Sequence, residues 1–351
     1  MSEIASILSG TTALATVLKI VILVGAVMTA VAYTAFAERR IAGFIQERLG
    51  PNRVGPWGLL QPLADGLKFI FKEEIIPKMA HRPTFMLAPA ITVTCALATY
   101  AVLPLGRPFE AFGRTIVPQI AQLDVGILYI FAIASLGVYG VVLAGWSSNN
   151  KYSLMGGLRS SAQLISYELA MTLSAVGVLM ASGSLHLADI VESQAGTLWY
   201  AVAMPVGFFV FVVAAFAETN RLPFDLPEAE AEIVAGYHTE YSSMKFAMFY
   251  IGEYIHMTMA SCLITLLFLG GWHLPVLDRW IGAMEPVSRA AAHGAVFVAK
   301  VAAMIFVYMW VRWTLPRFRY DQLMKLGWKV LLPLALLNIL WVGTAVLMGW
   351  F

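Results

Sequence analysis

Eight runs of about twenty mostly apolar residues limit what this 351-residue chain can fold into. An α-helix rises about 1.5 Å per residue, so about 20 apolar residues cross the roughly 30 Å hydrocarbon core of a bilayer. The runs therefore predict an all-α polytopic membrane protein with about eight transmembrane helices, at residues 12–37, 84–103, 125–145, 161–182, 198–217, 246–271, 291–311 and 328–349.

The composition supports this class. Hydrophobic residues make up 60% of the chain and charged residues 13%, and the mean hydropathy is +0.75. A soluble domain has about 45–50% apolar and about 25% charged residues. We therefore expect residues 1–351 to form a single integral membrane domain rather than a series of soluble domains.

Lysine and arginine are unevenly divided between the connections. The four odd-numbered connections carry 17 of these residues, counting Lys329 at the edge of the last run, and the three even-numbered ones carry 4. The positive-inside rule then predicts that the odd connections lie inside and both termini outside. We expect the bacterial inner (plasma) membrane, with the mitochondrial inner membrane as the alternative.

Two of the runs contain a carboxylate, Glu168 in one and Glu253 in the other. Counted from the nearest flanking charge, both lie roughly 12–14 Å into the membrane. An ionisable group at this depth costs at least about 2.5 kcal/mol and usually marks an ion or proton path. The alternative is a carboxylate that is protonated or paired and only tolerated. His256 follows Glu253 by three residues and is its candidate partner on the same helix face.

The first inner connection, residues 38–83, is long and contains a helical pattern. Pro62 suits a first helical turn, and apolar residues recur beyond it at helical spacing on one face, with charged residues on the other. The apolar face has Leu63, Leu67, Ile70 and Phe71, and the charged face has Asp65, Lys68 and Lys72. We expect a short amphipathic helix at the membrane surface. It is either a lipid-facing helix without a ligand or a wall of a cavity.

The third and fifth connections are polar. In the third, which is rich in glycine, Ser160 or Ser161 is predicted to cap the helix that carries Glu168. The fifth sets six acids against Arg221: Glu218, Asp225, Glu228, Glu230, Glu232 and Glu240. If these acids pack together, repulsion raises some of the pKa values within the loop. The alternative is a solvated acidic loop, and the neighbouring Leu222-Pro223-Phe224 favours packing.

The sequence offers no pattern for a bound redox group. Cys95 and Cys262 lie inside apolar runs without CxxC spacing, the six histidines are scattered, and no GxGxxG or P-loop motif occurs. We therefore predict no metal site and no redox cofactor in this chain, so that any electrons must come from a partner.

Four segments carry a resemblance to a known family. They are AERRIAGFIQERLGPNRVGPWGLLQPLADGLK, GWSSNNKYSLMGGLRSSAQLISYE, FAETNRLPFDLPEAEAEIVAGYHTEY and RWTLPRFRYDQLMKLGWK. These segments resemble the quinone-site membrane subunit of proton-pumping NADH:quinone oxidoreductase, respiratory complex I, called subunit 1 or, in bacteria, the H subunit. The resemblance covers essentially the whole chain in order.

The resemblance implies quinone as the substrate, expected to be ubiquinone, with an entrance and tunnel for its isoprenoid tail in this subunit. It implies peripheral-arm subunits and small membrane subunits as partners, the lipid bilayer as the surroundings, and no nucleic acid. By matching motif, the quinone-binding residues are Arg39, Arg48, Asp65, Lys68, Phe69, Arg221, Phe224, Arg317 and Arg319. The residues implied for proton and charge transfer are Glu168, Glu218, Glu228, Glu230, Glu232, Glu240 and Glu253.

Three other functions stay open from the residues. A secondary ion transporter would use Glu168, Glu253 and Lys300, but no internal repeat is evident. The membrane subunit of an energy-converting hydrogenase is related and uses no quinone. A structural membrane anchor would leave the two carboxylates at matching depth without a role.

Overall fold

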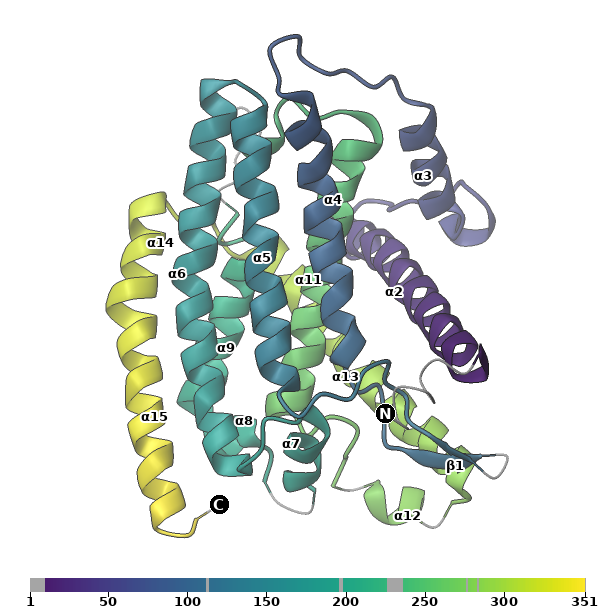
Figure 1. Cartoon of the computed structure of the whole chain (residues 1–351), viewed down its shortest axis with the longest axis vertical. Coiled ribbons are helices and arrows are strands. Elements are labelled where there is room, and N and C mark those ends of the chain that lie inside the picture. Colours follow the sequence, from purple (N-terminus) through teal and green to yellow (C-terminus); the bar gives the residue numbers. More distant parts are fainter. Residues whose placement is uncertain are drawn as a thin grey trace.

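The computed structural model describes residues 10–111, 114–195, 198–225, 236–275, 277–282 and 284–350, and these ranges are mainly helical (Figure 1). Within them, seven helical segments are long and apolar enough to cross a membrane. They are α2 (Gly10–Ile45), α4 (Arg82–Ala98) with its 3₁₀ continuation η2 (Thr99–Val102), α5 (Gly126–Ser147), α6 (Lys151–Ser182), α11 (Ser243–Phe268), α13 (Pro286–Thr314), and α14 (Tyr320–Leu326) joined to α15 (Leu332–Leu347) through the π-helical turn η4 (Gly327–Leu331). The predicted all-α polytopic membrane protein is confirmed.

The fifth predicted transmembrane helix is broken in two. Residues 198–217 form α8 (Tyr200–Ala203) and α9 (Pro205–Glu218), because Met204 leaves the helical conformation before Pro205, at φ −130° and ψ 63°. Proline has no N–H for the helix and disfavours α conformation in the preceding residue. The 14 residues of α9 span only about 21 Å. Among the described residues, the eight predicted spans thus correspond to seven long apolar helices and one shorter apolar helix.

Several helices extend beyond the predicted boundaries. Helix α6 begins at Lys151, where Oδ1 of Asn150 accepts a hydrogen bond from the Tyr152 N–H at 2.9 Å. The prediction of a cap at Ser160 or Ser161 is therefore wrong, and most of the third connection is helix. Its glycines serve close helix contacts: a Cβ on Gly157 would lie 3.4 Å from the Cα of Gly145 in α5. The first and seventh spans likewise continue past residues 37 and 311.

The predicted amphipathic helix is present as α3 (Gln61–Phe71), with Pro62 in its first turn and no fully buried residue. Figure 1 shows α3 set apart from the bundle, beside the tilted α2. A 3₁₀ turn, η1 (Pro56–Gly58), precedes it, and the Ser243 hydroxyl at the start of α11 donates to the Phe69 and Lys72 carbonyls at 2.9 and 3.0 Å. These bonds fix the end of α3 against the bundle. We call this side of the molecule the α3 end.

Small elements cover the opposite end of the bundle, which we call the hairpin end (Figure 1). They are the antiparallel strands β1 (Phe109–Ala111) and β2 (Arg114–Ile116), with α7 (Leu187–Ser193) and α12 (Asp278–Gly282). The ammonium group of Lys19 reaches out of α2 to the Val117 and Gln119 carbonyls at 3.3 and 3.4 Å. This outward reach matches the expected behaviour of a lysine near the end of an apolar helix.

Helix α11 is the central helix of the bundle. It contacts α2, α3, α4, α6, α9 and α13. Its residues from Met257 to Phe268 are buried without interruption. The core around it is formed mainly by Ile, Leu, Val, Phe and Met side chains, which excludes water from this part of the molecule. Two groups that lie on different faces of α11 are therefore separated from each other by the full thickness of this helix.

Candidate functional site

A large cavity of about 560 Å³ lies between α2, α3, α11 and α13. From Met28 to Ala42 it follows α2 over fifteen residues, or about 21 Å. Its lining changes along this length. The part near Met28 is aliphatic and aromatic, whereas the part near the α3 end has charged side chains. The lining includes Met28, Val31, Ala35, Phe36, Glu38, Arg39, Arg48, Gln61, Asp65, Phe69, Tyr250, Ile251, Tyr254, Arg312 and Trp313.

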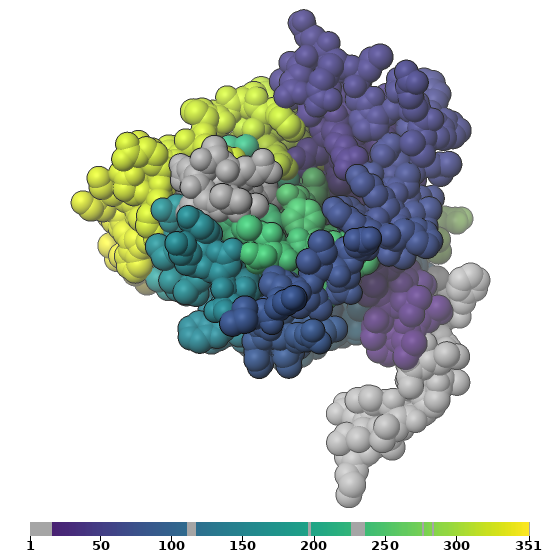
Figure 2. Space-filling view, turned by 90° about the horizontal axis from the view of Figure 1, so that it is seen from above, coloured from purple at the N-terminus to yellow at the C-terminus, as the bar shows by residue number. Residues whose placement is uncertain are grey.

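Helix α3 forms one wall of this cavity through a short polar chain. The Arg39 guanidinium donates to Oδ2 of Asp65 at 2.6 Å, and the Gln61 amide donates to the other oxygen at 3.1 Å. Phe69 lines the cavity one turn further along. The alternative that α3 is only a lipid-facing helix is thereby disfavoured. Seen from above in Figure 2, the first inner connection (purple to blue) lies on one side and the last helices (yellow) on the other.

A buried ionic cluster closes the large cavity toward the bundle. The Glu38 carboxylate, 4% exposed, is bonded by the guanidinium groups of Arg221, at 3.2 Å, and of Arg312. The Tyr254 hydroxyl donates to the same carboxylate at 2.8 Å, and the Arg221 guanidinium lies 4.2 Å from the centre of the Tyr254 ring. Two guanidinium groups thus bond one carboxylate at the polar end of the cavity.

Sequence reasoning did not identify Glu38, Arg312 or Tyr254 as site residues. Glu38 and Arg312 each follow a predicted span by one residue, at 37 and 311, and so were assigned to connections. The structure continues α2 and α13 through both positions. The available signal was Glu38 itself, since a carboxylate within an uninterrupted helical pattern requires a cationic partner when it is buried.

A second, much smaller cavity of about 50 Å³ lies on another face of α11. It is lined by three carboxylic side chains and one histidine, which are Glu168, Glu218, Glu253 and His256. A neighbouring cavity of about 20 Å³ shares Glu218 and His256 with it. A water needs roughly 10–15 Å³ of such space, so the two cavities have room for a few waters. We call the pair the acidic cavity.

Hydroxyl groups hold two of these acids. The Ser135 hydroxyl of α5 donates to Oε1 of Glu168, and the Tyr237 hydroxyl donates to Oε1 of Glu253 at 3.5 Å. Tyr237 belongs to the 3₁₀ turn η3 (Gly236–His238). The following Tyr241 anchors this turn by stacking on Phe85, with ring centres 4.0 Å apart, and by donating to its carbonyl. Burial raises the pKa of Tyr241 to about 12, so it stays a neutral donor.

The large cavity and the acidic cavity lie close to each other at two places in the chain. On α11, Glu253 lines the acidic cavity while its neighbour Tyr254 lines the large one. At the end of α9, Glu218 lines the acidic cavity and Arg221, three residues later, bonds Glu38 on the large cavity. The two cavities are therefore separated by one helix but share a short stretch of charged side chains.

The structure distributes the predicted quinone residues unevenly. Arg39, Arg48, Asp65 and Phe69 line the large cavity, and Arg221 lies behind it through Glu38. The other four do not belong to its lining. Lys68 is exposed on α3, and Phe224 is buried against Tyr167 and Phe318. Arg317 bonds Asp225 at 3.3 Å, while Arg319 pairs with Asp321 and is 76% exposed.

The predicted acids also separate into groups. Glu168, Glu218 and Glu253 meet at the acidic cavity, with His256 on the expected face. Glu240 lies at the α3 end, where its carboxylate accepts from the Asn150 amide at 2.6 Å. Glu228, Glu230 and Glu232 fall outside the described residues. Arg221 and Asp225 are nearly fully buried, so the described part of the fifth connection is packed rather than solvated.

Comparison with known proteins gives a consistent result. The family described as NADH dehydrogenase matches residues 18–343. The H subunit of NADH-quinone oxidoreductase from Leptospira biflexa is 52% identical over 336 residues, covering 93% of each chain. An H subunit of the same enzyme from Geobacter metallireducens is 52% identical over 345 residues, covering 95% of this chain and 96% of its own. One from Cytophaga hutchinsonii is 48% identical over 316 residues, covering 90% and 92%.

Proposed function

Since this chain belongs to the NADH dehydrogenase family, we propose that it takes up quinone in NADH-quinone oxidoreductase, respiratory complex I, and couples its reduction to proton translocation. The enzyme in which it acts is an oxidoreductase complex, and the chain supplies the quinone-binding part within the membrane. Electrons come from a partner subunit, since we expect no redox centre in this chain.

The single observation that carries the quinone proposal is the change in lining along the large cavity. An isoprenoid tail is apolar and needs an apolar channel, which the stretch from Met28 to Phe36 offers. A quinone headgroup has two carbonyl oxygens that accept hydrogen bonds, and cationic donors make such bonds stronger. Arg39 and the Glu38 cluster, with its two guanidinium groups as donors, lie at the polar end. The quinone would therefore bind in one orientation, with its tail along the apolar stretch and its headgroup at the polar end.

The coupling proposal rests on the charges between the two cavities. Reducing quinone to quinol takes up two electrons and two protons, so charge changes at the headgroup during the reaction. A headgroup near Glu38 would alter the field at Arg221, and Arg221 is three residues from Glu218. Glu168, Glu218, Glu253 and His256 would respond as one coupled set, exchanging protons through the waters of the acidic cavity.

The surroundings of the chain follow from the same proposal. Its partners are other subunits of the complex: peripheral-arm subunits against the α3 end and neighbouring small membrane subunits along the bundle. We propose the bacterial plasma membrane as its location, with the α3 end inside and both termini outside, as the excess of lysine and arginine in the odd connections indicates. The substrate would be ubiquinone.

Blocking the large cavity tests the proposed function. Ala35 lines it, so Ala35→Trp in the complex should narrow the path of the tail and raise KM for a long-tailed quinone about tenfold, which corresponds to about 1.4 kcal/mol. A short-chain quinone analogue should be affected less. Ala30→Trp is the matched control, because Ala30 lies on the same helix with an exposed side chain.

NADH oxidation by a hydrophilic artificial acceptor should stay normal in both variants, since electron entry does not use this chain. Equal losses with long and short quinones in Ala35→Trp, or an effect of the same size in Ala30→Trp, would contradict a tail in this cavity.

A further inference from the structure

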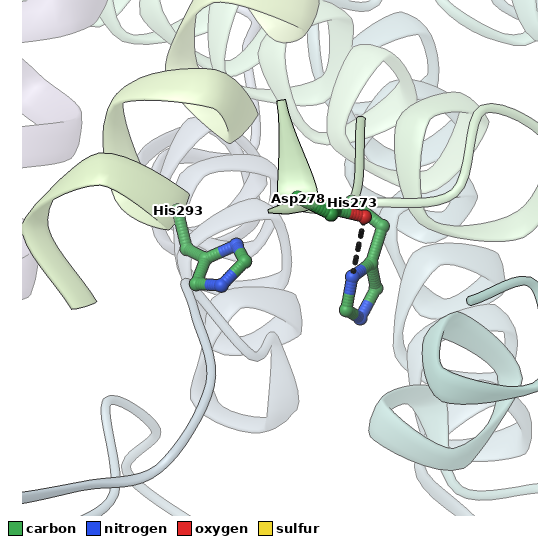
Figure 3. Close-up of side chains that lie close together, drawn as sticks. All are labelled: His273, Asp278 and His293. Carbon is green, nitrogen blue, oxygen red and sulfur yellow. Dashed lines mark hydrogen bonds and ion pairs between the residues drawn. The ribbon is translucent and has the colours of Figure 1, made fainter. Parts of the chain in front are cut away.

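Three metal-ligand side chains meet at the hairpin end, far from both cavities of the proposed site. His273 follows α11 by five residues, Asp278 begins α12 and His293 lies in the second turn of α13. One ligand atom of each lies within 4.8 Å of the others, and Nδ1 of His273 is 3.3 Å from Oδ2 of Asp278 (Figure 3). The spacings of five and fifteen residues match no sequence signature of a metal site, so the cluster arises from the fold.

The hydrogen bond of His293 leaves its Nε2 for a cation, and one tautomer of His273 leaves its Nδ1. Nδ1 of His293 lies 3.2 Å from the Trp272 carbonyl, which can only accept, so it bears the proton and Nε2 has the free lone pair. Nε2 of His273 lies 3.5 Å from a carboxylate oxygen of Glu192. When Nε2 donates to Glu192, the lone pair of Nδ1 faces Asp278. Two acceptors 3.3 Å apart then need a cation between them.

Distances and ligand types favour a zinc-like ion. With bonds of about 2.0–2.1 Å, neighbouring ligands of a tetrahedral Zn²⁺ are about 3.3 Å apart, which is the separation between His273 and Asp278. Two imidazoles and one carboxylate suit borderline divalent transition ions better than Mg²⁺ or Ca²⁺, which prefer oxygen. A carboxylate beside the outer nitrogen of a ligating histidine can fix the ring and strengthen the ligand, and Glu192 lies 3.5 Å from Nε2 of His273.

The backbone under the cluster is held firmly. The ammonium group of Lys300 donates to three carbonyls of the loop after α11, those of Leu269, Gly271 and His273, at 2.6, 3.0 and 2.6 Å. Oε1 of Gln194 accepts from the Gly270 N–H at 3.1 Å. Lys300, an intramembrane lysine, thus fixes the His273 backbone relative to α13. Rigid support of this kind is what a metal site requires.

The cluster is sheltered but reachable. His273 and His293 are 6% and 4% exposed, and a cavity of about 330 Å³ that is lined by His293, Arg107 and Arg289 lies next to it. Of these two arginines, Arg107 is paired with a carboxylate, whereas Arg289 bonds neutral carbonyls and keeps its charge. Arg107 pairs with Glu192 at 3.4 Å, and Arg289 donates to the Gly282 and Met284 carbonyls.

We propose that His273, Asp278 and His293 bind one divalent transition-metal ion, Zn²⁺ above all, with water in the fourth position and Glu192 orienting His273. The ion would clamp the loop after α11 to the starts of α12 and α13. The competing arrangement has no ion: a protonated His273 bridges Asp278 and Glu192 as a salt bridge.

Zinc binding to the purified full-length chain in detergent separates the two arrangements. Equilibrium dialysis with radioactive Zn²⁺ should give one tightly bound ion per chain. Asp278→Asn and His293→Gln should each weaken binding at least tenfold, and Glu192→Gln by about tenfold, as for other residues that orient a ligand. His186→Gln is the matched control, because His186 pairs with Asp189 near the same end but outside the cluster, and it should bind like the wild type.

X-ray absorption at the zinc edge of the wild-type chain gives a readout that needs no variant. The spectrum is expected to show two imidazole nitrogens and oxygen ligands, all at zinc–ligand distances of about 2.0–2.2 Å. Wild-type protein that binds no zinc, or zinc that binds equally well in His293→Gln, would overturn the proposal and leave His273 as a salt-bridge residue. A spectrum dominated by sulfur or by oxygen alone would also overturn it.

Discussion

The two faces of α11 border cavities of opposite character. On one face, about 560 Å³ is lined mainly by aliphatic and aromatic side chains, and the charged groups at its end include the Arg39–Asp65 pair and the Glu38 cluster. On the other, about 50 Å³ holds Glu168, Glu218 and Glu253 beside His256. The first has the size and lining for a long apolar molecule. The second has room only for waters and protons. Helix α11 thus separates a space for ligand binding, the large cavity, from a space lined by ionisable groups, the acidic cavity.

The contact between the two spaces is narrow, and this makes the comparison testable. Arg221 touches the large cavity through Glu38, and the residues just before it, Thr219 and Asn220, line the acidic cavity. A substitution on the large-cavity face of α11 should therefore alter quinone binding alone, and one on the acidic-cavity face should alter coupled quinone reduction and proton pumping alone. A substitution at Arg221 should alter both.

The largest effect is expected at Arg221. Arg221→Leu leaves the buried Glu38 with one guanidinium partner in place of two, and breaking a buried ion pair costs about 3–5 kcal/mol. We expect a strongly lowered thermal midpoint of the complex and loss of both quinone reduction and pumping. Arg312→Leu is the comparison, since its side chain is 22% exposed and water can partly replace it. An equal or larger loss of thermal stability in Arg312→Leu would contradict the central position of Arg221.

A smaller effect is expected from neutralising the acidic cavity. Glu253→Gln and Glu168→Gln keep the shape of the side chain but remove the ionisable group. Each should lower quinone reduction and proton pumping in reconstituted vesicles by about tenfold, with normal assembly, while KM for long-tailed quinone stays unchanged. The double variant should lose less than the sum of the two losses in activation free energy, because residues that act as a unit are non-additive.

Wild-type rates and pumping in both Gln variants of a fully assembled complex would exclude this coupling. A raised KM for quinone would show that the acids belong to the binding space, and the two faces of α11 would then not differ as described.

The smallest effect compares two carboxylates on short helices at the α3 end. Asp65 pairs with Arg39 on the wall of the large cavity, and Asp321 of α14 pairs with the exposed Arg319, which precedes that helix. Asp65→Ala should raise KM for quinone a few-fold because Arg39 loses the partner that positions it. Asp321→Ala should leave quinone kinetics unchanged and cost at most about 1 kcal/mol of stability, as exposed pairs do. Steady-state kinetics of both variants test this prediction. An equal change of KM for quinone in both would contradict a role of Asp65 in the large cavity that Asp321 lacks.

Much of the architecture could be predicted because lipid imposes strong rules on sequence. Twenty-residue apolar runs located seven of the spans, and the pattern around Leu63 and Asp65 located α3. The shared depth of Glu168 and Glu253 marked both as candidates for an ion or proton path, and the structure has both in the lining of the acidic cavity. These features depend on local periodicity and helix geometry, which the sequence records directly.

The features that could not be predicted from the sequence have a common physical cause. Glycine and serine in the third connection suggested a loop, but Gly145 and Gly157 allow two helices to approach closely. Glu38 was assigned to a connection because its partners, Arg221 and Arg312, are 183 and 274 residues away. The metal-ligand cluster of His273, Asp278 and His293 likewise forms from three elements. Contacts over such separations are set by tertiary packing, which local pattern does not encode.

Mapping the binding position of a photoreactive long-tailed quinone in the intact complex tests the central claim most directly. The account predicts covalent labelling of α2 between residues 28 and 42 and of the large-cavity face of α11, at Tyr250, Ile251 or Tyr254, with native quinone preventing the labelling. No label is expected on Glu253 or His256. Competed labelling of those two residues, or competed labelling that leaves α2 and the large-cavity face of α11 untouched, would contradict the assignment of the large cavity to quinone.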